Sequence, residues 1–88
     1  MDAISETVDA MAEAPDDRPR EVLDVVDLPP PEPLARTLER LTDLEEETVL
    51  VQRNDRAPQH LYPKLEDRGY RHATVEWDDD VVTVIWRP

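Results

Sequence analysis

The sequence predicts an α+β fold, a two-layer α/β sandwich in the order β-α-β-α-β-β, with a four-stranded mixed sheet and both helices on one face. Three observations lead to this prediction. Apolar stretches of strand length occur at 21–28, 48–52, 72–77 and 81–86. Segments with leucines at helical spacing separate the first three of them. A short aspartate run separates the last two and suits a tight hairpin.

The first 20 residues form an acidic segment ahead of the predicted domain at 21–88. Three of its apolar residues follow helical spacing and predict a short helix within 1–14: Ile4, Val8 and Met11. A lone helix of this length is marginal in water, so two alternatives stay open. The segment is either a frayed or disordered terminus, or a helix that covers an open sheet face or a partner.

The first strand is expected at 21–28 and is followed by the proline-rich stretch 28–33. Proline lacks the N–H donor that a strand ladder needs, so this stretch ends the strand. Pro33 suits a first helical turn, where an N–H would have no partner. The leucines that follow form one stripe and predict a helix from 33 to 45: Leu34, Leu38, Leu41 and Leu44.

The second strand, 48–52, has three apolar residues in succession, which predicts burial on both faces. A second helix is predicted at 58–68, with regular helix only from about His60 because Pro63 weakens its first turns. Gly69, the only glycine, stands where a left-handed residue commonly ends a helix.

The strand at 72–77 alternates apolar and polar residues, whereas the strand at 81–86 is apolar on both faces and is expected to be central. Two right-handed crossovers predict two parallel strand pairings, and the hairpin predicts one antiparallel pairing. Trp77 and Trp86 are interpreted as sheet residues rather than a stacking platform.

Charge narrows the possible partners. The chain has 22 acidic and 10 basic residues and a net charge of −12, which disfavours nucleic acid and anionic membranes. Nine of the ten basic residues are arginine, and Lys64 is the only lysine. An acidic, lysine-poor surface is interpreted as adaptation to molar salt, as in a halophilic archaeon, where self-repulsion is screened. The acidic start of the chain lacks the pattern of a signal peptide, so a cytoplasmic location is expected.

Several chemistries are excluded by residue type. The chain has no cysteine, which removes disulfides, thiolate metal sites and cysteine nucleophiles. One glycine cannot build a phosphate-binding loop, and Ser5 is the only serine. His60 and His72 lack metal-ligand spacing. We therefore expect no enzyme activity, no cofactor and no metal site.

A candidate binding site follows from the predicted parallel strands. Loops after two paired parallel strands lie at the same sheet edge, which brings the loop 53–57 near the start of the first helix. An anion resting on that helix start beside Arg56 is one possibility. The candidate residues are Pro30, Pro31, Glu32, Pro33, Arg53, Asn54, Arg56 and His60.

Four motifs in order resemble the domain-of-unknown-function family 2249, which has a fold like the TusA/SirA sulfur carriers: Leu23-Asp24-Val25, Leu28-Pro29-Pro30-Pro31-Glu32-Pro33-Leu34, the stretch from Leu61 to Tyr70, and Val84-Ile85-Trp86-Arg87. The resemblance covers 21–88. In the sulfur carriers, a Cys-Pro-x-Pro motif opens the first helix, and its cysteine carries a persulfide. Pro30 stands in place of that cysteine here, so the resemblance implies the fold without sulfur transfer.

The first hypothesis is a non-enzymatic module that acts through contacts with another protein, as a monomer or weak homodimer. The alternative is a protein that binds a small anion or a metal ion at the same edge. A third hypothesis, an accessory subunit in sulfur or redox metabolism, rests on fold analogy alone.

Overall fold

The structure is a computed structural model that describes residues 7–88. Ile4, part of the predicted N-terminal helix, lies outside the described residues. The elements are β1 (Arg20–Asp24), α2 (Glu32–Asp43), β2 (Val49–Asn54), α3 (Leu61–Asp67), β3 (Arg71–Trp77) and β4 (Asp80–Trp86). Their order is the predicted β-α-β-α-β-β, and the sheet is four-stranded and mixed.

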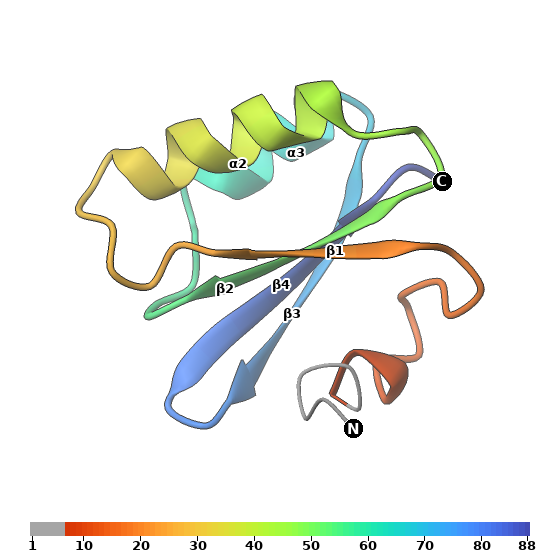
Figure 1. The fold of residues 1–88 in the computed structure, drawn as a ribbon, viewed down its shortest axis with the longest axis horizontal. Helices are drawn as coiled ribbons and strands as arrows, with labels where there is room; N and C mark the ends of the chain where they lie inside the picture. Colours follow the sequence, from red (N-terminus) through yellow and green to blue (C-terminus); the bar gives the residue numbers. More distant parts are fainter. Residues whose placement is uncertain (1–6) are drawn as a thin grey trace.

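The strands lie side by side in the order β1-β2-β4-β3. β1 pairs with β2 in parallel, whereas β4 is antiparallel to both β2 and β3 (Figure 1). The expectation of a second parallel pairing is therefore wrong, because β4 lies between β2 and β3. The reason is burial: β4 is buried from Val82 to Trp86, and the central position pairs both of its edges while hydrophobic clusters cover both of its faces.

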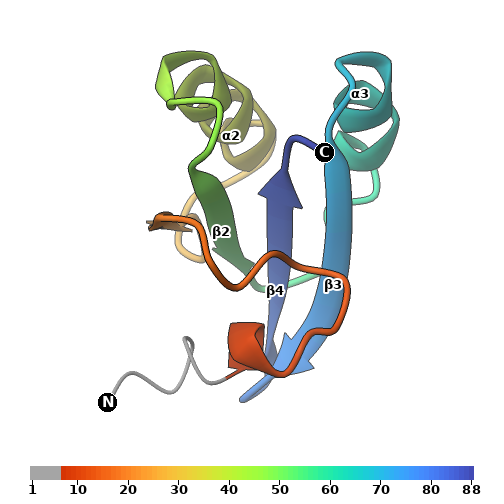
Figure 2. The same cartoon turned by 90° about the vertical axis from the view of Figure 1, so that its right-hand side faces the viewer.

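The helices α2 and α3 lie together on one side of the sheet (Figure 2). Their apolar side chains form one core cluster with residues of β2 and β4: Leu41, Leu61, Leu65, Leu50 and Ile85. The partly buried residues around this cluster include the rest of the predicted leucine stripe: Leu34, Leu38 and Leu44. The leucine spacing thus placed α2 correctly to within two residues at each end.

The opposite face of the sheet is covered by the N-terminal segment, which is the red to orange stretch below the sheet in Figure 1. Val8 is 1 % exposed and belongs to a second cluster with Val49, Val51, Val82, Val84 and Trp86. Met11 and Ala14 pack against the same cluster. An ion pair of 2.6 Å between Arg20 and Asp9 also holds the segment. Of the two alternatives, the described part of the segment therefore forms a cover over the sheet.

Strand boundaries differ from the prediction for local reasons. β1 ends at Asp24 instead of 28, because the Asp24 carboxylate accepts the N–H of Val26 at 3.0 Å and turns the chain. β2 continues to Asn54, and the Arg53 carbonyl accepts the N–H of Val25 at 2.9 Å. Arg53 and Asn54 are thus strand residues rather than loop residues.

Two turns follow the predicted backbone rules. Gly69 has φ +81°, and the N–H of Tyr70 donates to the Leu65 carbonyl at 3.0 Å, which confirms the predicted helix end. Asp78 and Asp79 have φ of +50° and +70° in the two-residue hairpin between β3 and β4. Within residues 7–88, no helix has the length and apolar character to cross a membrane.

Candidate binding pocket

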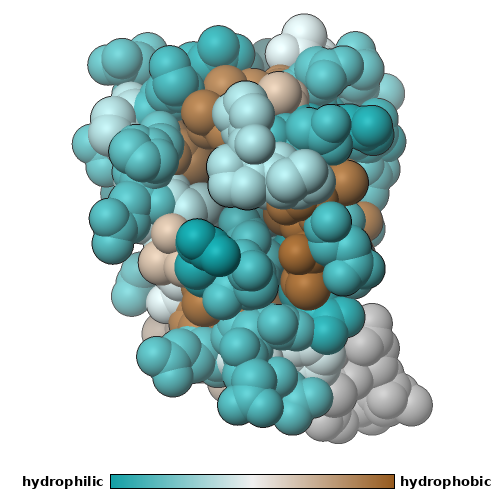
Figure 3. Space-filling model, turned by 90° about the vertical axis from the view of Figure 1, so that its left-hand side faces the viewer, coloured by the Kyte–Doolittle hydropathy of each residue, from teal (hydrophilic) through white to brown (hydrophobic). Residues whose placement is uncertain are grey.

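A pocket of about 810 Å³ lies where the parallel strands β1 and β2 end, between the loop that leads into α2 and the loop that leads into α3. We call it the proline pocket. Figure 3 views this end of the molecule and shows brown hydrophobic surface among hydrophilic side chains. Its lining residues are Leu28, Pro30, Pro31, Pro33, Leu34, Gln52, Asn54, Asp55, Arg56, Ala57, Pro58, Gln59, His60, Leu61 and Lys64.

The proline pocket gathers six of the eight candidate residues: Pro30, Pro31, Pro33, Asn54, Arg56 and His60. They come from two segments more than twenty positions apart in the chain. The parallel pairing of β1 and β2 brings these segments together, because it places the carboxyl ends of both strands at one sheet edge.

Glu32 and Arg53 do not line this pocket. Arg53 lies on the face covered by the N-terminal segment, because side chains alternate along β2 and Val49 and Val51 share its side. Its guanidinium donates to Asp80 at 2.6 and 2.8 Å and lies 5.1 Å from the ring centre of Trp77. The bond to Asp80 raises the pKa of Arg53. Arg53 thus has a structural role on the other face.

Two linked hydrogen bonds of buried polar side chains lie below the pocket and were not predicted from the sequence. Thr37 and Gln52 are both fully buried. The Thr37 hydroxyl donates to the Pro33 carbonyl at 2.7 Å and accepts the Gln52 side-chain N–H at 2.7 Å. A hydroxyl has only one hydrogen, so this arrangement orients the Gln52 amide and leaves its Oε1 without a partner. The sequence feature that could have indicated this buried hydrogen bond is a glutamine directly after the apolar run Val49-Leu50-Val51.

The charges around the proline pocket differ from those of the whole chain. Its permanent charges are Arg56 and Lys64 against one carboxylate, Asp55. The Arg56 guanidinium lies 3.2 Å from Asp55, but both side chains are well exposed, which makes this a weak pair. The chain's three side-chain amides, Gln52, Asn54 and Gln59, all line the pocket.

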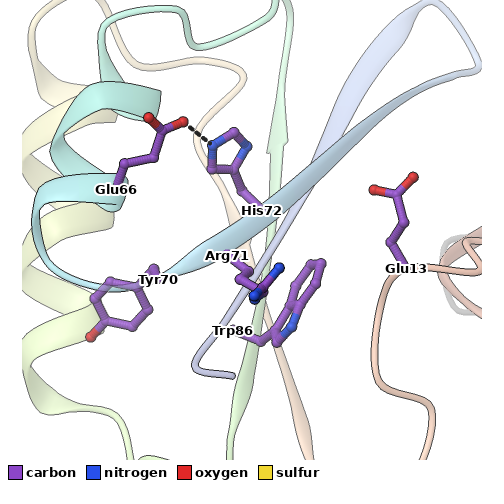
Figure 4. A pocket seen from close by; sticks show the side chains of 6 residues that line it. All are labelled: Glu13, Glu66, Tyr70, Arg71, His72 and Trp86. Atoms are coloured by element: carbon purple, nitrogen blue, oxygen red, sulfur yellow. Dashed lines mark hydrogen bonds and ion pairs between the residues drawn. The ribbon is translucent and has the colours of Figure 1, made fainter.

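A second cavity of about 510 Å³ lies at another edge and is lined by Glu13, Glu66, Tyr70, Arg71, His72 and Trp86 (Figure 4). His72 Nε2 lies 3.2 Å from the Glu66 carboxylate, and its ring stacks on Tyr62 with 4.5 Å between ring centres. Figure 4 shows the Glu13 carboxylate apart from the others. Across residues 7–88 no three metal-ligating side chains are grouped so as to hold an ion.

Comparison with known proteins gives one finding. A family model described as "Uncharacterized conserved protein (DUF2249)" matches residues 22–87. The match begins inside β1 and includes both segments that form the proline pocket. Searches among curated proteins and among solved structures found no match.

Proposed function

We propose that this chain, which belongs to the DUF2249 family of uncharacterized conserved proteins, is a non-enzymatic binding module that takes a small ligand in the proline pocket. The observation that carries the proposal is the convergence of two distant segments on one concave site. That site combines an apolar wall with a few polar groups, as small-molecule sites commonly do. The unpartnered Oε1 of Gln52 adds a polar atom that a ligand can satisfy.

A TusA/SirA-like arrangement is part of this proposal. It is supported by the element order, by the two helices on one side of the sheet, and by the prolines that open α2. In that arrangement, Pro30 takes the place of the persulfide-carrying cysteine of the sulfur carriers. Because proline has no nucleophilic atom, Pro30 would contact a ligand without forming a covalent bond to it.

A protein partner is the second candidate. Pro29, Pro30 and Pro31 are exposed at the rim of the pocket and form a rigid apolar surface beside it. The net charge of −12 favours a partner with a basic patch, although molar salt would weaken that attraction. An accessory role in sulfur or redox metabolism rests on fold analogy alone.

The test is a two-dimensional amide NMR screen of a fragment library against the wild-type chain and two variants. Ala57→Trp fills the proline pocket from an exposed loop position, and Ala35→Trp places the same side chain on an exposed part of α2 outside the pocket lining. We expect fragments to shift signals of residues 28–34 and 52–64. Ala57→Trp should abolish these shifts, and Ala35→Trp should retain them. Shifts that survive Ala57→Trp, or none with any fragment, would refute the proposal.

We also propose that the acidic surface is an adaptation to molar salt. Its support is the net charge of −12 together with a single lysine. At about 1 M ionic strength the screening length is roughly 3 Å, so repulsion between surface carboxylates is largely removed. Denaturation curves should show greater stability in about 2 M KCl than at low salt. Equal or greater stability at low salt would contradict this interpretation.

A further inference from the structure

We propose that the ligand of the proline pocket is a small organic anion that carries a hydrogen-bond donor, with the anionic group at Arg56 and Lys64 and the donor at Gln52 Oε1. This inference rests on the proposed function and specifies its ligand chemistry. It is carried by three observations on the lining: its charge, its apolar wall and its one unpartnered buried atom.

The charge of the lining favours an anion. Acidic residues outnumber basic ones by more than two to one in the chain, yet Arg56 and Lys64 face a single carboxylate, Asp55, in the pocket. The lysine is the only one in the chain, and no described residue forms an ion pair with it. Salt would screen the repulsion from the distant carboxylates more strongly than a direct contact with these two cations, because screening grows with distance.

The wall of the pocket favours an organic body over a bare inorganic ion. Its apolar residues include Leu28, Pro30, Pro31, Pro33, Leu34 and Leu61. The three prolines have no backbone N–H, so they offer none of the amide donors with which proteins commonly surround phosphate or sulfate. A carbon framework between the anionic group and the donor would instead bury apolar surface against this wall.

The inner end of the pocket favours a donor on the ligand. Gln52 Oε1 is a buried acceptor without a partner, and the bonds from Gln52 to Thr37 and from Thr37 to Pro33 fix its amide. Buried acceptors are rarely left unpaired in folded proteins. A ligand hydroxyl or N–H group supplies the missing bond. The atom is covered, so the ligand must displace neighbouring lining side chains to reach it.

The first experiment compares three probes by amide NMR at the same high salt concentration: para-hydroxybenzoate, benzoate without the donor, and para-hydroxybenzamide without the charge. The side-chain amide region of the spectrum is simple, because the protein has only three carboxamide side chains: Gln52, Asn54 and Gln59. We expect para-hydroxybenzoate to shift the Gln52 side-chain signal. Each of the other two probes should bind about fivefold more weakly, the effect of one lost hydrogen bond or ionic contact.

Charge variants test the anionic subsite. Arg56→Gln and Lys64→Gln remove the two cations of the pocket, and Arg68→Gln removes an exposed cation outside its lining. The first two should weaken para-hydroxybenzoate binding by about fivefold each, and the third should leave it unchanged. An equal loss in all three would mean that overall charge alone acts, which would overturn the anionic subsite.

Gln52→Met tests the donor subsite, because it removes the unpartnered acceptor at similar volume. It should abolish the advantage of para-hydroxybenzoate over benzoate and leave benzoate binding intact, which also shows that the variant is folded. A retained advantage would overturn the assignment of Gln52. If neutral fragments bind in the pocket and none of the anions does, this inference is wrong and the binding module stands. If no organic molecule binds, both proposals fail.

Discussion

The most direct test of the fold is Val8→Ala, because Val8 anchors the N-terminal segment to the sheet. Its side chain is 1 % exposed and belongs to the cluster that includes Val51 and Val84. The substitution removes two buried carbons at about 0.8 kcal/mol each, and the residual cavity adds to this. The segment is attached on one side only and can settle into the space, so we expect a loss of about 1.5–2.5 kcal/mol in the free energy of unfolding.

The assay is urea unfolding at one fixed salt concentration, with Val22→Ala as the matched control. Val22 lies on the same face of the sheet but is 49 % exposed, so its truncation should cost less than about 0.5 kcal/mol. In a domain of this size, each kcal/mol corresponds to roughly 4–8 °C in the melting midpoint. If Val8→Ala costs no more than Val22→Ala, the N-terminal segment does not pack on the sheet as described.

Three further predictions concern single positions. Gly69→Ala should cost about 1 kcal/mol in urea unfolding, because φ is +81° while an added Cβ meets nothing within 4 Å; an unchanged midpoint would contradict that backbone conformation. The hydrogen bond from Arg40 lowers the pKa of Glu21. The ion pair between these two residues therefore stabilises the fold at pH values above the ordinary carboxyl pKa, and this stabilisation is lost as the pH falls through the lowered pKa of Glu21. Glu21→Gln should therefore cost about 0.5 kcal/mol at neutral pH and nothing in acid, and a gap constant with pH would refute this. Asp79→Gly should raise stability by about 0.5 kcal/mol in thermal melts, because residue 79 has φ +70° in the hairpin; a lower midpoint would count against the turn geometry.

The fold was largely predictable because its elements are local and strongly patterned. Leucine spacing predicted α2, and burial on both faces predicted that β4 is central. The second parallel pairing was wrong because crossover rules fix the direction of a strand, not which strand lies next to it. β3 does run parallel to β2, but β4 lies between them. Only the competition between strands for the central position decides that order.

The site was predictable where it depended on topology and not where it depended on strand length or buried polar pairing. Pairing of β1 with β2 was enough to place Arg56 near Pro30. Arg53 was misplaced because β2 runs two residues further than expected, which gives Arg53 a fixed side of the sheet. Thr37 and Gln52 meet only after α2 docks on β2, so no local pattern identifies their bond.

Because the N-terminal segment covers one face of the sheet, the part of the chain that matches the family model is shorter than the part that packs into the fold. The family match starts at residue 22, whereas the hydrophobic cluster on that face is completed by Val8, Met11 and Ala14. A chain cut at the family boundary would keep both helices and three whole strands, but it would lose the first two residues of β1 and the segment that covers one hydrophobic cluster. It would expose valines on adjacent strands, a surface that favours self-association. Family members that lack such a segment would have to cover this face in another way.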